Sequence, residues 1–182
     1  RRRRLVVLRV VVHDQDGGVN EATWNKLVRA REEHMGNPAL RLLVPELLFR
    51  RRAEGEAREQ LLQVAADLPD YAPGRAGLAQ VLVALGEFDA ARPHADAAIE
   101  GDPTNLSARL SRALIAREAG DHAAAEADLA MAVSLSLRDA ALRFDHGYEL
   151  LCLGRIEEGV ATYRELTSLQ PAHALGHYNL AC

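Results

Sequence analysis

Residues suited to metal binding or catalysis are sparse and scattered in this sequence. His173 and His177 are four residues apart, a spacing that places two imidazoles on one face of a helix, as some zinc sites require. His173, however, is expected in a loop, and no third ligand is close in sequence. Residues 14–18 (DQDGG) are similar to the start of a calcium loop, but glycine replaces the third oxygen ligand. We therefore expect scattered histidines, a solvated turn, no metal site and no cofactor.

Nucleophilic chemistry has little support in the sequence either. The two cysteines, Cys152 and Cys182, are too few for a disulfide framework and fit a reducing compartment. We expect them to form a reduced, partly buried pair. The sequence contains no CxxC motif, no legible Cys–His nucleophile arrangement and no glycine-rich phosphate loop. The carboxylates follow helix surfaces, so we predict that the chain is not an enzyme and has no catalytic residues.

The charge pattern narrows the classes of partner. The formal net charge is −4; residues 1–37 hold eight basic and five acidic residues, and the remainder holds 14 and 21. The basic runs Arg1–Arg4 and Arg50–Arg52 lack interleaved aromatic residues, which favours solvated charge over a nucleic-acid site. No apolar run approaches the roughly 20 residues of a membrane span. We therefore expect no nucleic-acid or membrane partner, and a cytoplasmic location.

The strongest signal is a periodic spacing of glycines. Gly86, Gly120 and Gly154 recur at one constant interval, and each lies between two apolar stretches of helical length. Each segment is predicted to be a helix, a glycine turn and a second helix, with Asp89 as an N-cap in the first segment. Small residues recur with the same period: Ala79, Ala113, Gly147 and Ala181; Ala91, Ala125 and Gly159; Ala98 and Ala132, followed by Leu166.

This pattern resembles the tetratricopeptide repeat family, whose units have the same period of about 34 residues. Neither helix of such a unit can bury its apolar stripe alone, so stacked units share one core, and small residues let the helix axes approach. The resemblance implies an all-α fold, a right-handed solenoid of antiparallel helix pairs, with a divergent N-terminal segment. Full repeats are expected at 72–105, 106–139 and 140–173, a degenerate repeat with a shifted Gly55 at 38–71, and a partial repeat at 174–182.

Residues 1–37 depart from this pattern, and two interpretations stay open. Residues 5–12 (LVVLRVVV) are rich in β-branched valine and favour a strand, which would belong to a preceding α/β domain. Alternatively, the segment is a degenerate first repeat, since Gly18 has the same phase as the repeat glycines. A helix is predicted from an Asn20 cap to about Met35. Because the sequence begins without Met and stops inside a predicted helix, we expect it to be part of a longer protein.

In the tetratricopeptide repeat family, the first helix of each repeat lines a concave surface. Applied to this sequence, the family pattern assigns the partner-binding groove to Gln80, Leu110, Ser111, Leu114, Arg117, Phe144, Asp145, Tyr148, Tyr178 and Asn179. Phe144, Tyr148 and Tyr178 are predicted to form an aromatic anchor, unless Phe144 and Tyr148 fill the superhelix interior. Only Arg117 and Asn179 match the side chains with which some members grip a terminal carboxylate, so acidic tails are not the expected partner.

The resemblance implies a protein–protein interaction scaffold that binds a peptide or protein segment in this groove. The alternative is an accessory arm that presents substrate to a larger enzyme, namely a glycosyltransferase, sulfotransferase, methyltransferase or oxygenase, whose catalytic domain lies outside this chain. Neither the identity of the partner nor the oligomeric state follows from the sequence.

Overall fold

The computed structural model describes residues 21–33 and 36–181, and within these ranges the chain forms ten helices and no strand. The helices are α1 (Glu21–Glu33), α2 (Pro38–Arg50), α3 (Glu54–Asp67), α4 (Ala72–Ala84), α5 (Phe88–Gly101), α6 (Leu106–Glu118), α7 (His122–Leu135), α8 (Ala140–Cys152), α9 (Ile156–Leu169) and α10 (Ala174–Ala181). The predicted all-α class is therefore confirmed. Over the described ranges, no helix combines the length and the apolar character needed to cross a membrane.

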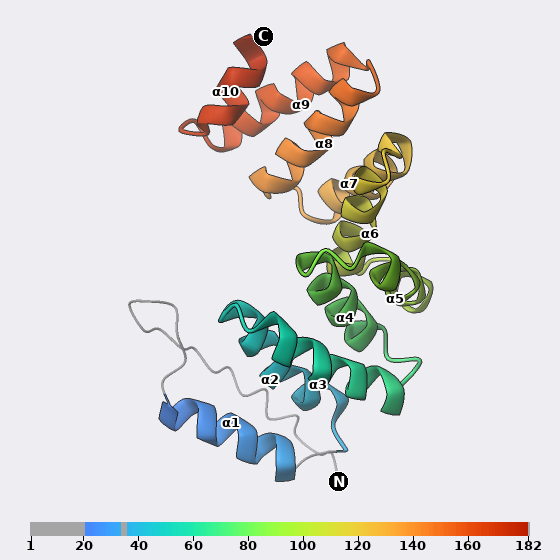
Figure 1. Ribbon diagram of the computed structural model, residues 1–182. Coiled ribbons are helices and arrows are strands. Elements are labelled where there is room, and N and C mark those ends of the chain that lie inside the picture. The colour runs from blue at the N-terminus through green and yellow to red at the C-terminus, as the bar shows by residue number, and fades with distance from the viewer. Residues whose placement is uncertain (1–20, 34–35, 182) are drawn as a thin grey trace, which may run out of the picture.

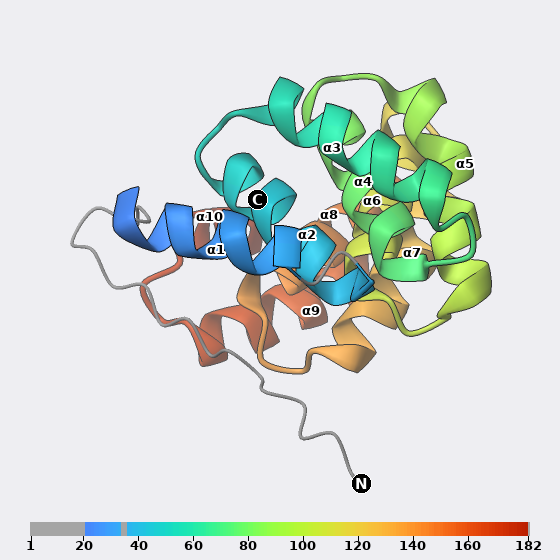
Figure 2. The same ribbon diagram turned by 90° about the horizontal axis from the view of Figure 1, so that it is seen from below.

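The helices stack as antiparallel pairs, α2 with α3, α4 with α5, α6 with α7 and α8 with α9, and α10 packs on α9. Figure 1 shows the pairs following one another along an arc, with α5 and α7 on its outer side. In Figure 2, which looks along the stack, α10 overlaps α1 although the two helices lie at opposite ends of the array in Figure 1. The stacked antiparallel pairs form the expected solenoid.

Several sequence predictions concern residues outside the described ranges. They are the basic run at 1–4, the strand or helix at 5–12, the turn at 14–18, the Asn20 cap, the helix end near Met35 and the contribution of Cys182. Of the N-terminal segment, the structure describes α1, whose residues Glu21–Glu33 stand one repeat period before residues 55–67 of α3, so α1 has the phase of a second helix. It packs on α2, where the Arg51 guanidinium lies 5.0 Å from the centre of the Trp24 ring.

The repeat glycines end the first helices by a common hydrogen-bond pattern. At Gly86 the backbone φ is +76°, a left-handed conformation that residues with a side chain rarely adopt. The Gly86 N–H donates to the Val83 carbonyl at 3.0 Å, and the Glu87 N–H donates to the Leu82 carbonyl at 2.9 Å. This pair of bonds is a Schellman motif, which satisfies carbonyls that the end of a helix leaves free. The same geometry recurs at the other two repeat glycines.

The pair α2–α3 keeps this turn without a glycine. Arg52 occupies the corresponding position with φ +61°, and its N–H donates to the Phe49 carbonyl at 3.0 Å. The Ala53 N–H completes the motif by donating to the Leu48 carbonyl at 3.0 Å. Gly55, which departs from the repeat spacing, lies in the first turn of α3 and takes no part in this turn. A left-handed residue with a side chain carries a steric cost of about 1–2 kcal/mol, which this pair bears at Arg52.

Asparagine and aspartate side chains cap the starts of several helices. Asn105, Asp121 and Asp139 each accept a hydrogen bond from a backbone N–H of the first turn, at 3.0, 3.0 and 2.9 Å. Helix α5 differs, because its N-cap is Glu87, whose side chain makes no capping hydrogen bond. Asp89 is the second residue of the helix. The predicted Asp89 cap was therefore wrong. The Asp89 carboxylate still lies in the first turn, where the helix dipole favours negative charge.

The recurring small residues lie where helices cross closely. The alanines of these positions are at most 2% exposed: Ala79, Ala91, Ala98, Ala113, Ala125 and Ala132. In the fourth pair glycine replaces alanine, because a Cβ on Gly147 would lie 3.0 Å from the buried ring of Tyr163. The small side chain on one helix therefore makes room for the large one on its neighbour.

A basic position also recurs with the repeat period, and it ties each pair together. It is occupied by Arg41, Arg75, Arg109, Arg143 and His177. Arg109 Nε donates to the Pro103 carbonyl of the preceding loop at 2.7 Å, and Arg109 Nη1 donates to Asp128 on α7 at 2.9 Å. Arg75 and His177 make the same contact with a loop carbonyl, at 3.0 and 2.8 Å. In the Arg109 unit, one side chain thus joins the loop, the first helix and the second helix.

The apolar packing is strongest in the N-terminal half of the array. One cluster of buried side chains runs through α2, α3, α4 and α5 and reaches Ile115 of α6. Helix α8 packs on α7 and α9, and charged contacts connect it to α6, since Arg117 bonds to Asp145 and Glu149. The junction between the pairs α6–α7 and α8–α9 is therefore more polar than the junctions before it.

We expect Arg52→Gly to raise the free energy of unfolding by about 0.5–1 kcal/mol, because glycine adopts the left-handed conformation without steric cost. Gly120→Ala should lower that free energy by about 1 kcal/mol for the converse reason. Urea denaturation followed by circular dichroism measures both changes. Gly55→Ala, inside α3, is the control and should be neutral or slightly stabilising. A loss of stability in Arg52→Gly would contradict the assigned turn.

Candidate functional site

The inner helices of the arc enclose a hollow of about 270 Å³. Helices α4 and α6 pack directly against each other, which places equivalent side chains of successive pairs side by side. The hollow is lined by Phe49, Gln80, Val83, Ala84, Ser107, Leu110, Ser111, Ala113, Leu114, Arg117, Leu129 and Asp145. Most of these side chains are apolar, and Leu114 is 37% exposed in the wall. A concave apolar surface with a few polar groups is typical of a binding site.

A second hollow, of about 330 Å³, adjoins the first. It lies between α2 and α4 and is lined by Leu42, Pro45, Glu46, Phe49, Arg50, Leu61, Pro73, Gly77, Gln80 and Val81. Phe49 and Gln80 line both hollows, so the two hollows share a wall. Together they follow α2, α4, α6 and the start of α8, and we call this surface the groove. Burial of the Glu46 carboxyl in this hollow raises its pKa, while Arg50 opposes the shift. The groove thus begins at an acidic group and ends near Asp145.

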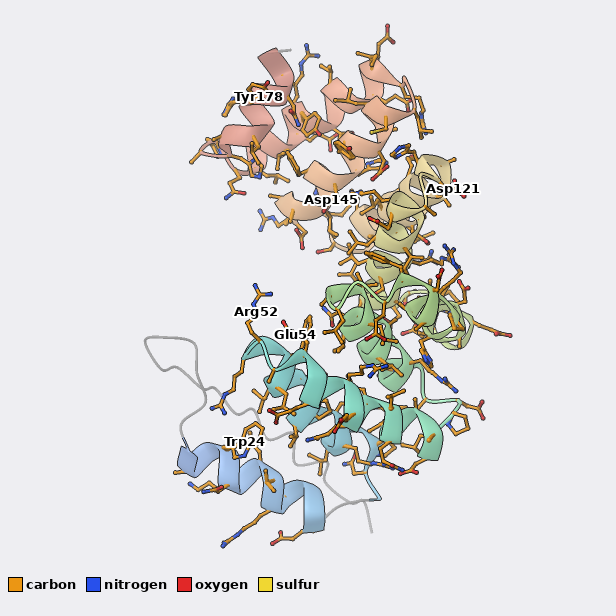
Figure 3. All side chains as sticks on the ribbon, viewed as in Figure 1. Trp24, Arg52, Glu54, Asp121, Asp145 and Tyr178 are labelled. Carbon is orange, nitrogen blue, oxygen red and sulfur yellow. The ribbon has the colours of Figure 1, made fainter. Side chains whose placement is uncertain are left out.

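Figure 3 shows how the labelled side chains lie relative to this groove. Asp145 and Tyr178 point to the open side of the arc, which is also the side of Arg52 at the end of α2, whereas Asp121 lies on the opposite side. The open side is therefore formed by the first helices of the pairs. This is the concave face on which the groove residues were predicted.

Arg117 is the centre of a charged network at the C-terminal end of the groove. Its Nη2 donates to Asp145 Oδ1 at 2.9 Å, its Nε donates to Glu149 Oε1, and its guanidinium lies 5.3 Å from the centre of the Tyr148 ring. Glu149 is fully buried, and its second oxygen lies 2.7 Å from His122 Nδ1. A buried carboxylate needs such partners, because desolvation of an unpaired charge is costly. Arg117 therefore faces two carboxylates inside the chain before any partner arrives.

The predicted aromatic residues take different roles. Tyr148 is 43% exposed beside Arg117, and Tyr178 is 66% exposed on α10. Phe144 instead packs edge to face on Tyr163, with ring centres 5.7 Å apart, and on the His173 ring at 5.4 Å. Burial raises the pKa of the Tyr163 hydroxyl, and the neighbouring Asn179 side chain opposes the shift. Phe144 thus holds the last helices together, Asn179 lies beside Tyr163, and the two exposed tyrosines lie on the surface.

The structure brings together six of the ten predicted groove residues. Gln80, Leu110, Ser111, Leu114, Arg117 and Asp145 line one hollow. Glu46 and Phe49 were not predicted, although they stand one repeat period before Gln80 and Val83 and the spacing therefore contained the signal. Pro45 and the absence of a turn glycine obscured the register of α2.

The sparse chemical residues of the sequence have structural partners. His173 Nδ1 accepts the Gly176 N–H at 3.0 Å and so caps α10, while His177 bonds to the Pro171 carbonyl. Cys152 is a free, exposed thiol, so the expectation of a partly buried side chain was wrong for this residue. The neighbouring Cys152 side chain is the main cause that raises the pKa of Tyr148.

Comparison with known sequences gives a consistent set of similarities. A sequence model of the tetratricopeptide repeat matches residues 77–140. The chain is 27% identical over 127 residues to tetratricopeptide repeat protein 6 of Homo sapiens, covering 70% of this chain and 24% of that protein. It is 30% identical over 95 residues to DnaJ homolog subfamily C member 3 of Mus musculus, covering 52% of this chain and 19% of that protein. The chain thus spans a quarter or less of the length of these relatives.

Solved structures show the same fold. YrrB, described as a TPR protein with an unusual peptide-binding site, superposes with a TM-score of 0.73 at 20% identity, covering 85% of this chain and 79% of that one. TTC0263, a thermophilic TPR protein of Thermus thermophilus, superposes with a TM-score of 0.69 at 22% identity, covering 88% of both chains.

The Arg117 network predicts a stability cost for neutralising its buried member. Glu149→Gln should lower the free energy of unfolding by about 2 kcal/mol. The substitution keeps the shape of the buried side chain but removes the negative charge that pairs with Arg117. Urea denaturation at neutral pH measures the change. Glu118→Gln is the matched control, since Glu118 is exposed on α6, and should change stability by less than about 0.5 kcal/mol. Equal effects of the two substitutions would contradict the network.

Proposed function

Since the chain belongs to the tetratricopeptide repeat family, whose arrays are protein–protein interaction scaffolds, we propose that it binds a peptide segment of another protein in the groove along α2, α4, α6 and α8. The observation that carries this proposal is that two adjoining hollows, which share Phe49 and Gln80, span three successive first helices. A small molecule needs one enclosed cavity, whereas an elongated segment matches a long open groove that presents equivalent positions at each repeat.

The walls of the groove favour a partner with an apolar side chain. The apolar stretch of the first hollow is lined by Phe49, Val83, Leu110 and Leu114. Leu114 is partly exposed in the free chain. Filling this stretch removes apolar surface from water, at about 25 cal/mol per Å². An aliphatic or aromatic residue of the partner is therefore the expected anchor.

The charges of the groove favour a partner that is basic next to this anchor. Glu46 and Arg50 line one hollow and offset each other, so the excess negative charge lies at the other end of the apolar stretch, where Asp145 lines the wall. Arg117 cannot balance a partner's carboxylate freely, because it is already shared between Asp145 and the buried Glu149. Arg117, Asp145 and Glu149 together carry one excess negative charge. A lysine or arginine of the partner is therefore attracted, and an acidic tail is repelled.

Two exposed tyrosines extend the surface beyond the hollows. Tyr148 and Tyr178 lie on α8 and α10 and supply large rigid rings at little cost in side-chain entropy. YrrB, the similar solved structure, is described as having a peptide-binding site, which supports the class of partner. The accessory-arm alternative concerns residues beyond this chain and stays a prediction.

Selection from a displayed peptide library, with the immobilised chain as bait, should enrich peptides with one apolar residue next to lysine or arginine. Leu114→Glu should weaken an enriched peptide at least about tenfold in fluorescence anisotropy, because it introduces a carboxylate into the apolar wall. Leu135→Glu is the matched control: Leu135 is exposed on the second helix α7, and this substitution should leave the affinity unchanged.

Tyr148→Ala tests the C-terminal extension of the surface and should weaken the same peptide by roughly tenfold or less. Asp145→Asn should weaken basic peptides and reduce the dependence of affinity on salt. The proposal fails if no peptide is enriched, or if the enriched peptide binds Leu114→Glu as tightly as the original chain.

A further inference from the structure

Three different metal-ligating side chains converge where α7 meets α8. His122 is the first residue of α7, and Glu149 and Cys152 lie three residues apart on the last turns of α8. One ligand atom of each side chain lies within 4.8 Å of the other two. We propose that His122, Glu149 and Cys152 bind a divalent transition metal ion of the zinc type. The sequence did not reveal this cluster, because His122 and Glu149 are 27 residues apart.

The donor set fits such an ion by type and by spacing. Nitrogen, carboxylate oxygen and thiolate sulfur are the three ligand types of protein zinc sites, at about 2.0–2.3 Å from the ion. In a tetrahedral site these bond lengths place the donor atoms about 3.3–3.6 Å apart. His122 Nδ1 and Glu149 Oε2 are 2.7 Å apart as hydrogen-bond partners, so the ion replaces the shared proton and separates them slightly. The sulfur of the exposed Cys152 is the third donor to the ion.

The surrounding groups already orient the ligands. Arg117 Nε donates to Glu149 Oε1 and leaves Oε2 for the ion, and Asp145 holds the same guanidinium at 2.9 Å. Outer partners of this kind fix carboxylate ligands in protein metal sites. The Glu149 carboxylate and a Cys152 thiolate together neutralise a dication, and Asp145 offsets the Arg117 charge.

The position of the cluster gives the ion a structural consequence. It joins α7 to α8 at the junction where charged contacts take over from the apolar cluster of α2–α6. A bound ion would brace this junction directly. Three protein donors leave the fourth position of a tetrahedral ion to water or to a group of a partner, as in other open sites.

Cobalt titration of the reduced chain tests the proposal, because Co²⁺ bound to thiolate absorbs in the near ultraviolet and tetrahedral Co²⁺ absorbs in the visible. A Cys182→Ser background leaves Cys152 as the only thiol. We expect both absorptions to saturate at one equivalent of Co²⁺, and Zn²⁺ to displace them. Cys152→Ser and His122→Ala should each reduce the affinity for Zn²⁺ at least about tenfold by calorimetry.

His146→Ala is the matched control, since His146 lies on the same helix α8 and pairs with Glu126 at 3.1 Å outside the cluster, and it should retain the affinity. The melting temperature should rise with Zn²⁺ in the control and not in Cys152→Ser. Circular dichroism establishes that each variant is folded; Cys152 is exposed, so its substitution leaves the core intact. A cobalt spectrum without the thiolate band, or an unchanged Zn²⁺ affinity in Cys152→Ser, would overturn the site.

Discussion

Close approach of the two helices in each pair is the constraint on which the rest of the array depends. A buried alanine or glycine at each crossing allows the axes to approach, and the large side chains of the opposite helix fill the remaining space. Tyr163 against Gly147 is the extreme case, since even one methyl group would crowd the ring.

Spacing in the sequence was sufficient to predict the fold, because its determinants are local. The left-handed turns at Gly86 and its equivalents need glycine, and the crossings need small residues, so both leave periodic marks. Prediction from the sequence failed where more than one residue type can occupy a helix cap or a left-handed turn. Glu87 occupies the cap position without capping, and Arg52 adopts the left-handed conformation in place of a glycine. Propensity is thus a preference that surrounding structure can override.

The groove was only partly predictable, since it depends on which side chains meet across pairs. The repeat period predicted that Leu110 and Leu114 lie on the concave face, and both residues line the first hollow. It could not indicate that Arg117 is shared between Asp145 and Glu149, because those contacts depend on the rotation of one pair against the next. Similarly, Phe144 is turned toward Tyr163, a partner on its own pair that residue type alone does not reveal. Side-chain contacts, both within and between pairs, are therefore where a structure adds most to the sequence.

The turn at each repeat closes with two hydrogen bonds to carbonyls of the helix it ends, three and five residues back along the chain. No neighbouring unit contributes to this closure. The direction of each new helix is therefore encoded inside a single unit, and duplication of one unit copies that direction together with the side chains. An array of this kind can grow or shrink in whole units during evolution while the geometry of each copied unit is preserved, so that the length of its binding surface varies independently of its local shape.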